Sequence, residues 1–303
     1  MIRFSQPLSA GAVDDLSLSP ATPGTWTLST PTTLRFVPKG AFAPFSTVHV
    51  TVRRRVTSVV GVHLRTPVRF SFSIGAPSQA RLEQLLAMQS YLPLRFRPAH
   101  RQRWTRAADQ IALFAPPAGR LRFESGWPAT LHILWAHDSG LMIRGAVMAF
   151  ESEHGMTMDG IAGPAVWSAL ERAQERGQRS SVAYSYAIAS ESEPETLTVW
   201  HAGREVLRTL ANTGIPGQPT ALGSYPVYER LRSQVMQGTN PDGSHYADPV
   251  SWVAYFNGGD AVHYFPRASF GYPQSLGCVE LPYSAAQTAW GYLTYGTLVT
   301  VAP

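Results

Sequence analysis

The chain contains a single cysteine, Cys278, in a stretch rich in glycine, proline and serine that runs from Phe270 to Leu281. One thiol cannot form a disulfide within the chain, and it cannot by itself build a thiolate metal site. An isolated cysteine is most often a small buried hydrophobic residue. Gly277 directly before it instead favours a backbone that comes close to a reacting group. His263 lies upstream and is of the residue type that activates a thiol nucleophile, so Cys278 and His263 are the first candidate pair.

A catalytic cysteine needs a base, because a thiol with a pKa of about 8.5 is only slightly ionised at neutral pH. The C-terminal region offers three histidines, His201, His245 and His263. His201 adjoins an expected hairpin turn, and His245 lies in a polar loop that could line a cleft. His263 ends an expected strand just before the loop that carries Cys278, which is the geometry expected of a base facing a nucleophile.

The elements that position this pair are mostly strands. Residues 25–29, 33–37, 47–52 and 68–72 alternate apolar and polar side chains between turn signals, which predicts a small β-sandwich. Residues 81–90, 143–151 and 164–170 have helical spacing, and residues 93–128 fit no pattern. From residue 181 onward the chain again predicts strands, at 181–188, 196–200 and 297–301, with one helix at 283–293.

Composition narrows the class of protein. The chain has 303 residues, a hydrophobic content of 44% and a formal net charge of +5, which allows two or three globular domains. No apolar run is long enough to span a membrane. Arginines are concentrated before residue 180 without any nucleic-acid-binding signature, so solvated arginines are favoured and no nucleic-acid partner is expected.

The residues around the pair resemble the L,D-transpeptidase catalytic domain. The segments that carry the resemblance occur in the family's order, and they are Asn212-Thr213-Gly214, Thr220–Val227, His263, Ser275-Leu276-Gly277-Cys278-Val279 and Gly296–Val301. Three positions depart from the family pattern. Leu276 replaces a histidine, Tyr264 replaces a small residue, and Glu280 stands where arginine or asparagine is usual. Glu280 is expected to attract an amine acceptor and to oppose formation of the thiolate.

The resemblance implies a mechanism. Cys278 would attack the carbonyl between the third residue and the terminal D-Ala of a peptidoglycan tetrapeptide, and His263 would act as base and acid. The Tyr264 carbonyl would orient the imidazole, and N–H groups around Gly277 would hold the oxyanion. Substrate-binding residues would be Ser275, Tyr255, Tyr246 and Tyr272, with no cofactor and no metal ion.

Two upstream regions also resemble known modules. Residues 1–76 resemble a bacterial Ig-like β-sandwich, and residues 79–178 resemble a small α-helical peptidoglycan-binding domain, with residues 181–303 as the β-rich catalytic domain. The expected fold is therefore multi-domain and mainly β. The expected partners are the stem peptides and glycan of peptidoglycan, which implies an extracytoplasmic location. Residues 1–7 do not look like a signal peptide, so an export segment is expected to be missing from this chain.

Two alternatives remain open. Because of Leu276, the protein could instead be a peptidoglycan-binding wall protein whose catalytic domain is weakened or inactive. It could also be a thiol L,D-carboxypeptidase or endopeptidase of the cell wall, which would release free peptide products and form no cross-link.

Overall fold

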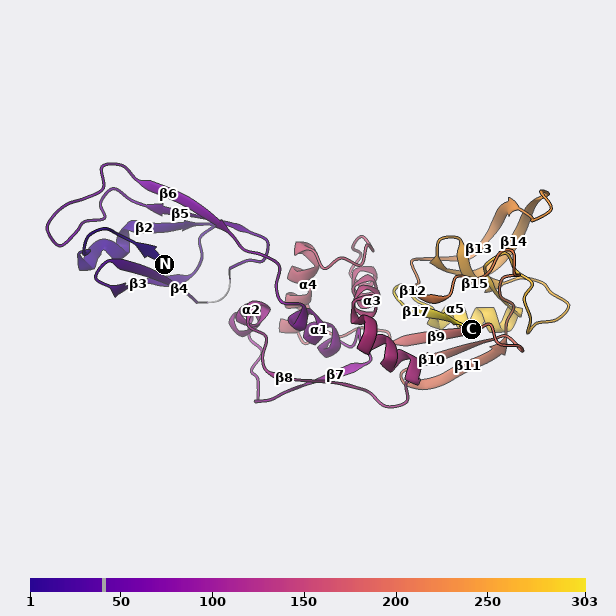
Figure 1. Cartoon of the computed structure of the whole chain (residues 1–303). Helices are drawn as coiled ribbons and strands as arrows, with labels where there is room; N and C mark the ends of the chain where they lie inside the picture. The colour runs from indigo at the N-terminus through magenta and orange to yellow at the C-terminus, as the bar shows by residue number, and fades with distance from the viewer. Residues whose placement is uncertain (40–41) are drawn as a thin grey trace. The chain divides into compact units, whose positions relative to one another are not determined.

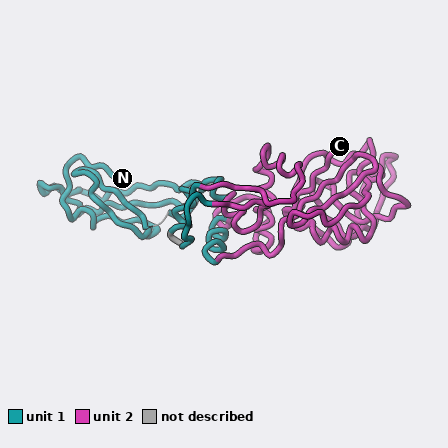
Figure 2. The backbone as a smooth tube through the Cα atoms, turned by 90° about the horizontal axis from the view of Figure 1, so that it is seen from below, with its two compact units in different colours: residues 1–82, 98–118, 167–176 teal, residues 83–97, 119–166, 177–303 magenta. Residues whose placement is uncertain are grey.

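The computed structural model describes residues 1–39 and 42–303, which form two compact units (Figure 2). Unit 1 comprises residues 1–82, 98–118 and 167–176, and unit 2 comprises residues 83–97, 119–166 and 177–303. Several β-sheets and a few helices confirm the expected mainly β fold class (Figure 1). The domain boundaries at residues 76, 79, 178 and 181 stay a prediction.

Unit 1 contains two three-stranded antiparallel sheets that share a core of Leu16, Leu34 and Val52. The strands in the order of each sheet are β1 (Ile2–Arg3), β4 (Thr33–Pro38) and β3 (Gly24–Thr30), then β2 (Leu16–Ser19), β5 (Thr47–Val52) and β6 (Val68–Ser73). A short 3-10 helix covers Ala10–Asp15. Buried residues alternate with exposed ones along β5, as the period of two in the sequence predicts. The four strands predicted before residue 75 are thus confirmed.

The middle of the chain holds four helices and a two-stranded sheet. They are α1 (Gln79–Met88), α2 (Arg106–Phe114), α3 (Ala129–Glu153) and α4 (Pro164–Glu175), with β7 (Leu94–Pro98) paired to β8 (Gly119–Phe123). The three predicted helices are confirmed as α1, α4 and the second half of α3. The elements within residues 93–128 were not predicted, although arginines alternate with apolar residues along β7 and β8, which is a strand signal.

α3 is two helices joined at Asp138, whose backbone is not helical (φ −146°, ψ 66°). The Asp138 carboxylate accepts a hydrogen bond from the Leu141 N–H at 3.1 Å, so it caps the second half. That half, which belongs to unit 2, carries the buried residues Met142, Ile143, Ala146, Val147 and Phe150.

The C-terminal part of unit 2 consists of two sheets and one helix around a shared core. The first sheet has the order β11 (Arg204–Leu210), β10 (Thr196–His201), β9 (Ser185–Ser190), β17 (Leu298–Ala302) and β12 (Gly223–Pro226). The second has the order β13 (Glu229–Thr239), β14 (His245–Asn257), β15 (Asp260–Tyr264) and β16 (Val279–Leu281). Helix α5 (Tyr283–Tyr292) buries its alanines in the core that both sheets share.

A contact between two glycines brings α3 against the turn before β17. A Cβ on Gly145 would lie 2.4 Å from the Gly296 carbonyl oxygen, and a Cβ on Gly296 would lie 2.0 Å from the Gly145 carbonyl oxygen. Gly296 also has a φ of +78°, which side chains rarely adopt. Both positions therefore require glycine, and the second half of α3 is held against the same body that carries Cys278.

In the part of the chain that the structure describes, we find no helix with both the length and the apolar character needed to cross a membrane.

We expect Gly145→Ala to destabilise unit 2 by about 1–3 kcal/mol, since the added methyl group overlaps a backbone oxygen. Gly140→Ala is the matched control, because Gly140 is exposed on the same helix and an alanine there has room. The control is expected to be neutral or stabilising by up to about 1 kcal/mol. Chemical denaturation of the two variants measures both effects, and equal stabilities would contradict the close packing.

Candidate active site

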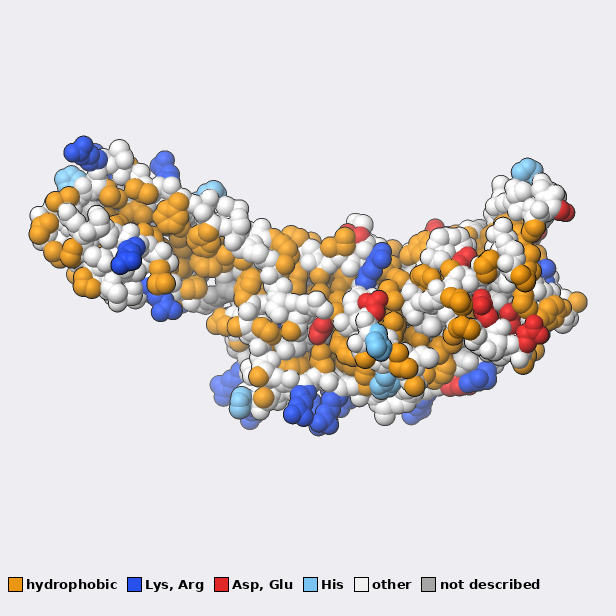
Figure 3. Space-filling view, viewed as in Figure 1, with side chains coloured by type: hydrophobic (Ala, Val, Ile, Leu, Met, Phe, Trp, Pro, Cys, Tyr) orange, Lys and Arg blue, Asp and Glu red, His pale blue; other side chains and the backbone are white. Residues whose placement is uncertain are grey.

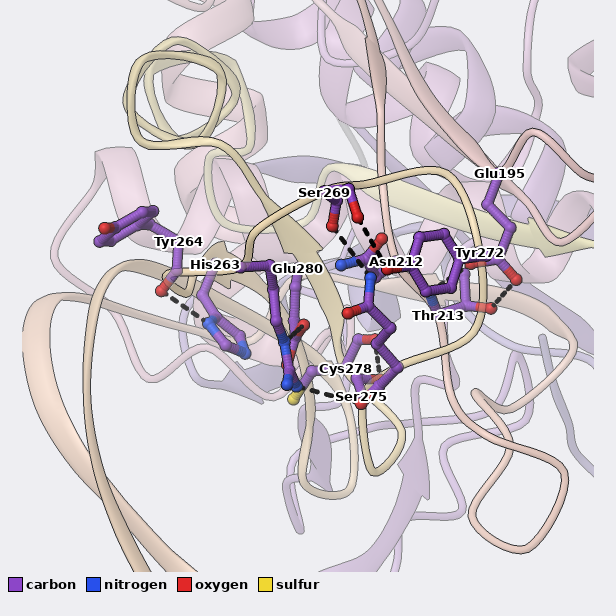
Figure 4. A network of polar contacts seen from close by, with 12 residues as sticks. Glu195, Asn212, Thr213, His263, Tyr264, Ser269, Tyr272, Ser275, Cys278 and Glu280 are labelled. Atoms are coloured by element: carbon purple, nitrogen blue, oxygen red, sulfur yellow. Dashed lines mark hydrogen bonds and ion pairs between the residues drawn. The ribbon is translucent and has the colours of Figure 1, made fainter.

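The pairing of β15 with β16 places Cys278 and His263 on one face of a sheet. The two strands are parallel, with Val262 opposite Val279 and His263 opposite Glu280. Paired residues on neighbouring strands point to the same face, and so do residues two apart on one strand. Cys278, Glu280 and His263 therefore share a face, and Figure 4 shows their side chains beside one another.

A cavity of about 530 Å³ opens over this face, and both Cys278 and His263 line it. The β13–β14 hairpin contributes much of its wall. Its other lining residues include Gln234, Met236, Tyr246, Asp248, Tyr255, Asp260, Phe265, Arg267, Gln274, Ser275, Leu276 and Glu280.

The hydrogen bonding of His263 defines its tautomer. His263 Nδ1 lies 3.0 Å from the Tyr264 carbonyl oxygen, and a carbonyl can only accept, so Nδ1 carries the proton (Figure 4). Nε2 is then left with a free lone pair. The residue is only 3% exposed, and burial lowers the pKa of His263, partly offset by the Tyr264 carbonyl and the Glu280 charge. His263 is therefore a neutral imidazole suited to accept a proton.

The thiol of Cys278 is protonated in this state. Burial of the thiol raises the pKa of Cys278 to about 12, and the carboxylates of Asp260 and Glu280 add to the rise, while the Ala261 N–H opposes it. Cys278 Sγ lies 3.8 Å from the Gly259 carbonyl oxygen, a suitable acceptor for its S–H. Within the described residues no hydrogen bond joins Cys278 to His263, so the two side chains must come closer before a proton passes between them.

Glu280 is not an isolated charge. Arg267 binds it with two hydrogen bonds, from Nε at 2.7 Å and from an Nη at 2.8 Å, and also donates to the Gln274 carbonyl at 3.0 Å. Glu280 therefore still raises the pKa of Cys278, but it is paired and does not attract an amine by itself. Arg267 was not predicted as a site residue, although it is the only arginine or lysine after Arg232 in the sequence.

The loop that carries the thiol is held by Ser275. The Ser275 hydroxyl donates to the Cys278 carbonyl at 2.6 Å and accepts from the Gly277 N–H at 3.2 Å. Gly277 has a φ of +119°, and a Cβ there would lie 2.6 Å from Asp260 Oδ1, so only glycine fits. Ser275 is 1% exposed and supports the loop in this state. Its part in substrate binding, and that of Gly277 in holding an oxyanion, stay predictions.

A second set of buried hydrogen bonds holds the same loop from the other side. Asn212 and Glu280 exchange backbone hydrogen bonds of 3.0 and 2.9 Å, and the Asn212 side chain accepts from the Gly271 N–H at 3.0 Å. Glu195, fully buried, accepts from both the N–H and the hydroxyl of Thr213 at 2.6 Å (Figure 4). The segment Asn212-Thr213-Gly214 therefore helps to hold the loop that carries Cys278, although the two are far apart in the sequence.

The structure brings most of the predicted site residues together, but not all of them. Tyr246 and Tyr255 line the cavity with Cys278, as does Leu276. Tyr272 is 41% exposed, donates to or accepts from the Ser269 hydroxyl at 2.7 Å, and is not a lining residue. His245 is exposed and lies outside the lining, so of the three histidines only His263 reaches the thiol's cavity.

The charges of the cavity are unbalanced. Arg267 is occupied by Glu280, so the carboxylates of Asp248 and Asp260 have no ion-pair partner among the described residues. On the face drawn in Figure 3, acidic side chains gather over the C-terminal part of unit 2. A search of residues 1–39 and 42–303 finds no cluster of His, Cys, Asp and Glu able to hold a metal ion.

Comparison with known proteins agrees with this site. Residues 185–301 match the family model YkuD, described as the L,D-transpeptidase catalytic domain. No curated protein matches the chain. Among solved structures, the chain is similar to an L,D-transpeptidase from Mycobacterium smegmatis, with 15% identity over 99% of this chain and 88% of that chain (TM-score 0.36). L,D-transpeptidase 3 from Mycobacterium tuberculosis matches with 16% identity over 99% and 89% (TM-score 0.36).

The catalytic domain of an Enterococcus faecium L,D-transpeptidase matches with 24% identity over 40% of this chain and 99% of that chain (TM-score 0.36). The assignment rests on the family match, which contains Cys278 and His263. This match identifies residues 185–301 as an L,D-transpeptidase catalytic domain.

We expect Asp260→Asn to lower the pKa of Cys278, because it removes a negative charge that opposes the thiolate. A fall of about one unit gives tenfold more thiolate, and the weaker nucleophile partly offsets this, so alkylation by iodoacetamide at pH 7 should speed up about threefold. Asp248→Asn is the control, since Asp248 lines the cavity but is not among the charges acting on Cys278. The pH dependence of the alkylation rate gives the pKa of Cys278 in each of the two variants. Equal pH profiles for Asp260→Asn and Asp248→Asn would contradict the role of Asp260.

We expect Arg267→Gln to destabilise unit 2 by about 3–5 kcal/mol, because it leaves the Glu280 carboxylate, 6% exposed, buried without its cation. Arg267→Gln combined with Glu280→Gln should recover most of that loss, since a neutral pair needs no cation. A double-mutant cycle of unfolding free energies measures the coupling. If the effects of Arg267→Gln and Glu280→Gln on the free energy of unfolding were additive, the two side chains would not be coupled, and their ion pair would not hold the loop.

Proposed function

We propose that the protein is a cysteine-dependent L,D-transpeptidase that acts on peptidoglycan tetrapeptide stems and forms 3→3 cross-links through a thioester acyl-enzyme. The observation that carries the proposal is that Cys278 and a buried, neutral His263 whose Nε2 is free line one cavity of about 530 Å³. The family match over residues 185–301 supports it. A neighbouring solved structure, the E. faecium catalytic domain, is described as acylated by ertapenem.

In the acylation step His263 Nε2 takes the thiol proton while Cys278 Sγ bonds to the carbonyl carbon that precedes the terminal D-Ala. The C–N bond then breaks, and the same proton passes from His263 to the departing D-Ala amine. Because the pKa of Cys278 is about 12 and that of His263 is lowered, proton transfer accompanies attack rather than preceding it. Substrate binding supplies the dipoles that stabilise the charges as they form.

The oxyanion is assigned to the N–H groups at Gly277 and Cys278. The Gly277 N–H donates to the Ser275 hydroxyl in the free protein, so it would exchange that weaker partner for the oxyanion. Each such donor is typically worth about 3 kcal/mol of transition-state stabilisation.

The second step uses an amine as acceptor. The amine nitrogen bonds to the thioester carbon, the C–S bond breaks, and His263 carries the amine proton back to sulfur. The unpaired carboxylates Asp248 and Asp260 favour a cationic ammonium group over an anion at the cavity, and this group loses one proton to solvent to become the neutral amine that attacks. This charge supports transfer to an amine over hydrolysis.

The remaining regions fit the same substrate. We assign residues 1–76 as an Ig-like spacer and residues 79–178 as a peptidoglycan-binding domain, and we expect the protein to act outside the cytoplasmic membrane. These assignments rest on the sequence resemblances and on the family to which residues 185–301 belong.

Incubation with a disaccharide-tetrapeptide muropeptide tests the function. Mass spectrometry should detect a cross-linked dimer together with released D-Ala, and Cys278→Ala should abolish both. His263→Asn should lower the rate at least about 100-fold, because it removes the general base. His245→Asn is the matched control, an exposed histidine of the same domain outside the cavity, and it should keep nearly full activity.

The same incubation separates the alternatives. A tripeptide product without dimer would identify a carboxypeptidase, in which water replaces the acceptor amine. No product, together with no ertapenem adduct on Cys278, would identify a binding protein with an inactive catalytic domain. Equal losses in His263→Asn and His245→Asn would contradict the assignment of the base.

A further inference from the structure

Unit 2 contains a second cavity, of about 240 Å³, that the proposed reaction does not use. Its walls come from five separate parts of the chain. They are Ser90 and Tyr91 after α1, the end of α3 from Gly145 to Glu153, the segment Ser180 to Ser185, and the turn Thr294 to Thr297, together with Arg230 of β13. Gly145 and Gly296, which contact each other, both belong to this wall.

Arg230 is a half-buried cation in this cavity without an anionic partner. Its guanidinium lies 3.9 Å from the ring centre of Trp290 and donates one hydrogen bond to the Trp290 carbonyl. Its Nε is buried and has no hydrogen-bond acceptor. Among the described residues no carboxylate forms an ion pair with it, and burial lowers its pKa. A desolvated guanidinium that lacks an anion is costly unless a ligand supplies one.

The one carboxylate that lines the cavity is already saturated. Glu153 accepts hydrogen bonds from the Tyr91 hydroxyl at 2.6 Å, the Ser180 hydroxyl at 2.8 Å, and the N–H and hydroxyl of Ser181 at 3.1 and 3.0 Å. These contacts lower the pKa of Glu153 and keep it ionised on its own side of the cavity. Glu153 therefore braces the wall and does not neutralise Arg230.

A further donor in the lining is also unused. The hydroxyl of Tyr184 is buried and has no hydrogen-bond partner, although buried hydroxyl groups nearly always have one. Its ring packs edge-on against Trp127 at 5.4 Å, which holds it in place. The cavity thus combines an unpaired guanidinium with an unpaired hydroxyl, and a carboxylate has the acceptor oxygens that both lack.

We propose that this cavity is a second, non-catalytic subsite that binds a carboxylate of a peptidoglycan stem peptide, with Arg230 as its principal contact. The choice of ligand rests on the proposed function, which supplies a polymer with carboxylates on every stem. Strand β13 joins the two cavities, since Arg230 lines the second and Gln234 lines the first. Four residues of strand span about 13 Å, so the parts of the two cavities that Arg230 and Gln234 line are separated by about that distance.

Binding is tested in the full chain carrying Cys278→Ala, which cannot turn over. Its probes are a disaccharide-tetrapeptide muropeptide and the same compound with its stem carboxylates amidated. Arg230→Gln should weaken binding of the acidic probe at least about tenfold, and amidation should do the same to the parent protein. Arg232→Gln is the control, because Arg232 is exposed on the same strand, lies 6.0 Å from the same Trp290 ring and lines neither cavity.

A local signal keeps the test valid if Arg230→Gln fails to fold. The Trp290 indole N–H donates to the Val253 carbonyl at 3.1 Å, so its NMR resonance reports on the ring beneath Arg230. The acidic muropeptide should shift this resonance in the protein that keeps Arg230, and the amidated form should not. An unchanged resonance, or equal affinities in the Arg230→Gln and Arg232→Gln proteins, would overturn the subsite.

Three further outcomes are informative. A larger shift with inorganic phosphate than with acetate at equal ionic strength would overturn the carboxylate ligand and favour a phosphate-rich wall polymer. Binding that depends on Arg230 in a protein that, with Cys278 intact, makes no cross-link would defeat the proposed function and leave the subsite standing. Cross-linking without any dependence on Arg230 would defeat only the subsite.

Discussion

The position of Cys278 depends on buried hydrogen bonds between the segment around Asn212 and the loop that precedes β16. Most of the loop between β15 and β16 has no regular secondary structure, so it cannot hold itself in place. The backbones of Asn212 and Glu280 exchange two hydrogen bonds, and the Arg267 side chain binds the Glu280 carboxylate and the Gln274 carbonyl. Because unsatisfied buried polar groups are costly, these bonds define one loop conformation.

The same burial that orders the loop keeps the reacting pair neutral. Burial raises the pKa of the thiol and lowers that of the imidazole, so the charged pair is disfavoured in the free protein. Glu280 contributes to this directly, and Arg267 limits its cost by pairing with it. Glu280, which departs from the family pattern, is therefore part of an ion pair across the loop, and Arg267 supplies the cation.

Unit 2 extends beyond the catalytic sheets, because glycines allow α3 to touch the turn before β17. The approach is closer than any side chain permits at Gly145 or Gly296. Both glycines line a cavity whose walls come from helical and β segments alike, with Arg230 and Glu153 on different parts of the lining. Strand β13 contributes to both cavities, so a single element connects the thiol's surroundings to the second site.

The sequence by itself determined the types of most elements outside residues 93–128, the candidate nucleophile and its candidate base. The strand predicted from apolar–polar alternation in residues 47–52 and the helix predicted at residues 283–293 are confirmed, because burial along an element repeats with the period of that element. The strands β7 and β8 within residues 93–128 were missed although arginines alternate with apolar residues along both. Only the tertiary structure decided that Arg267 pairs with Glu280, that Tyr272 lies outside the cavity and that Arg230 lacks an anion. Those facts depend on contacts between residues far apart in the chain, and no local pattern records which distant side chains share a buried space.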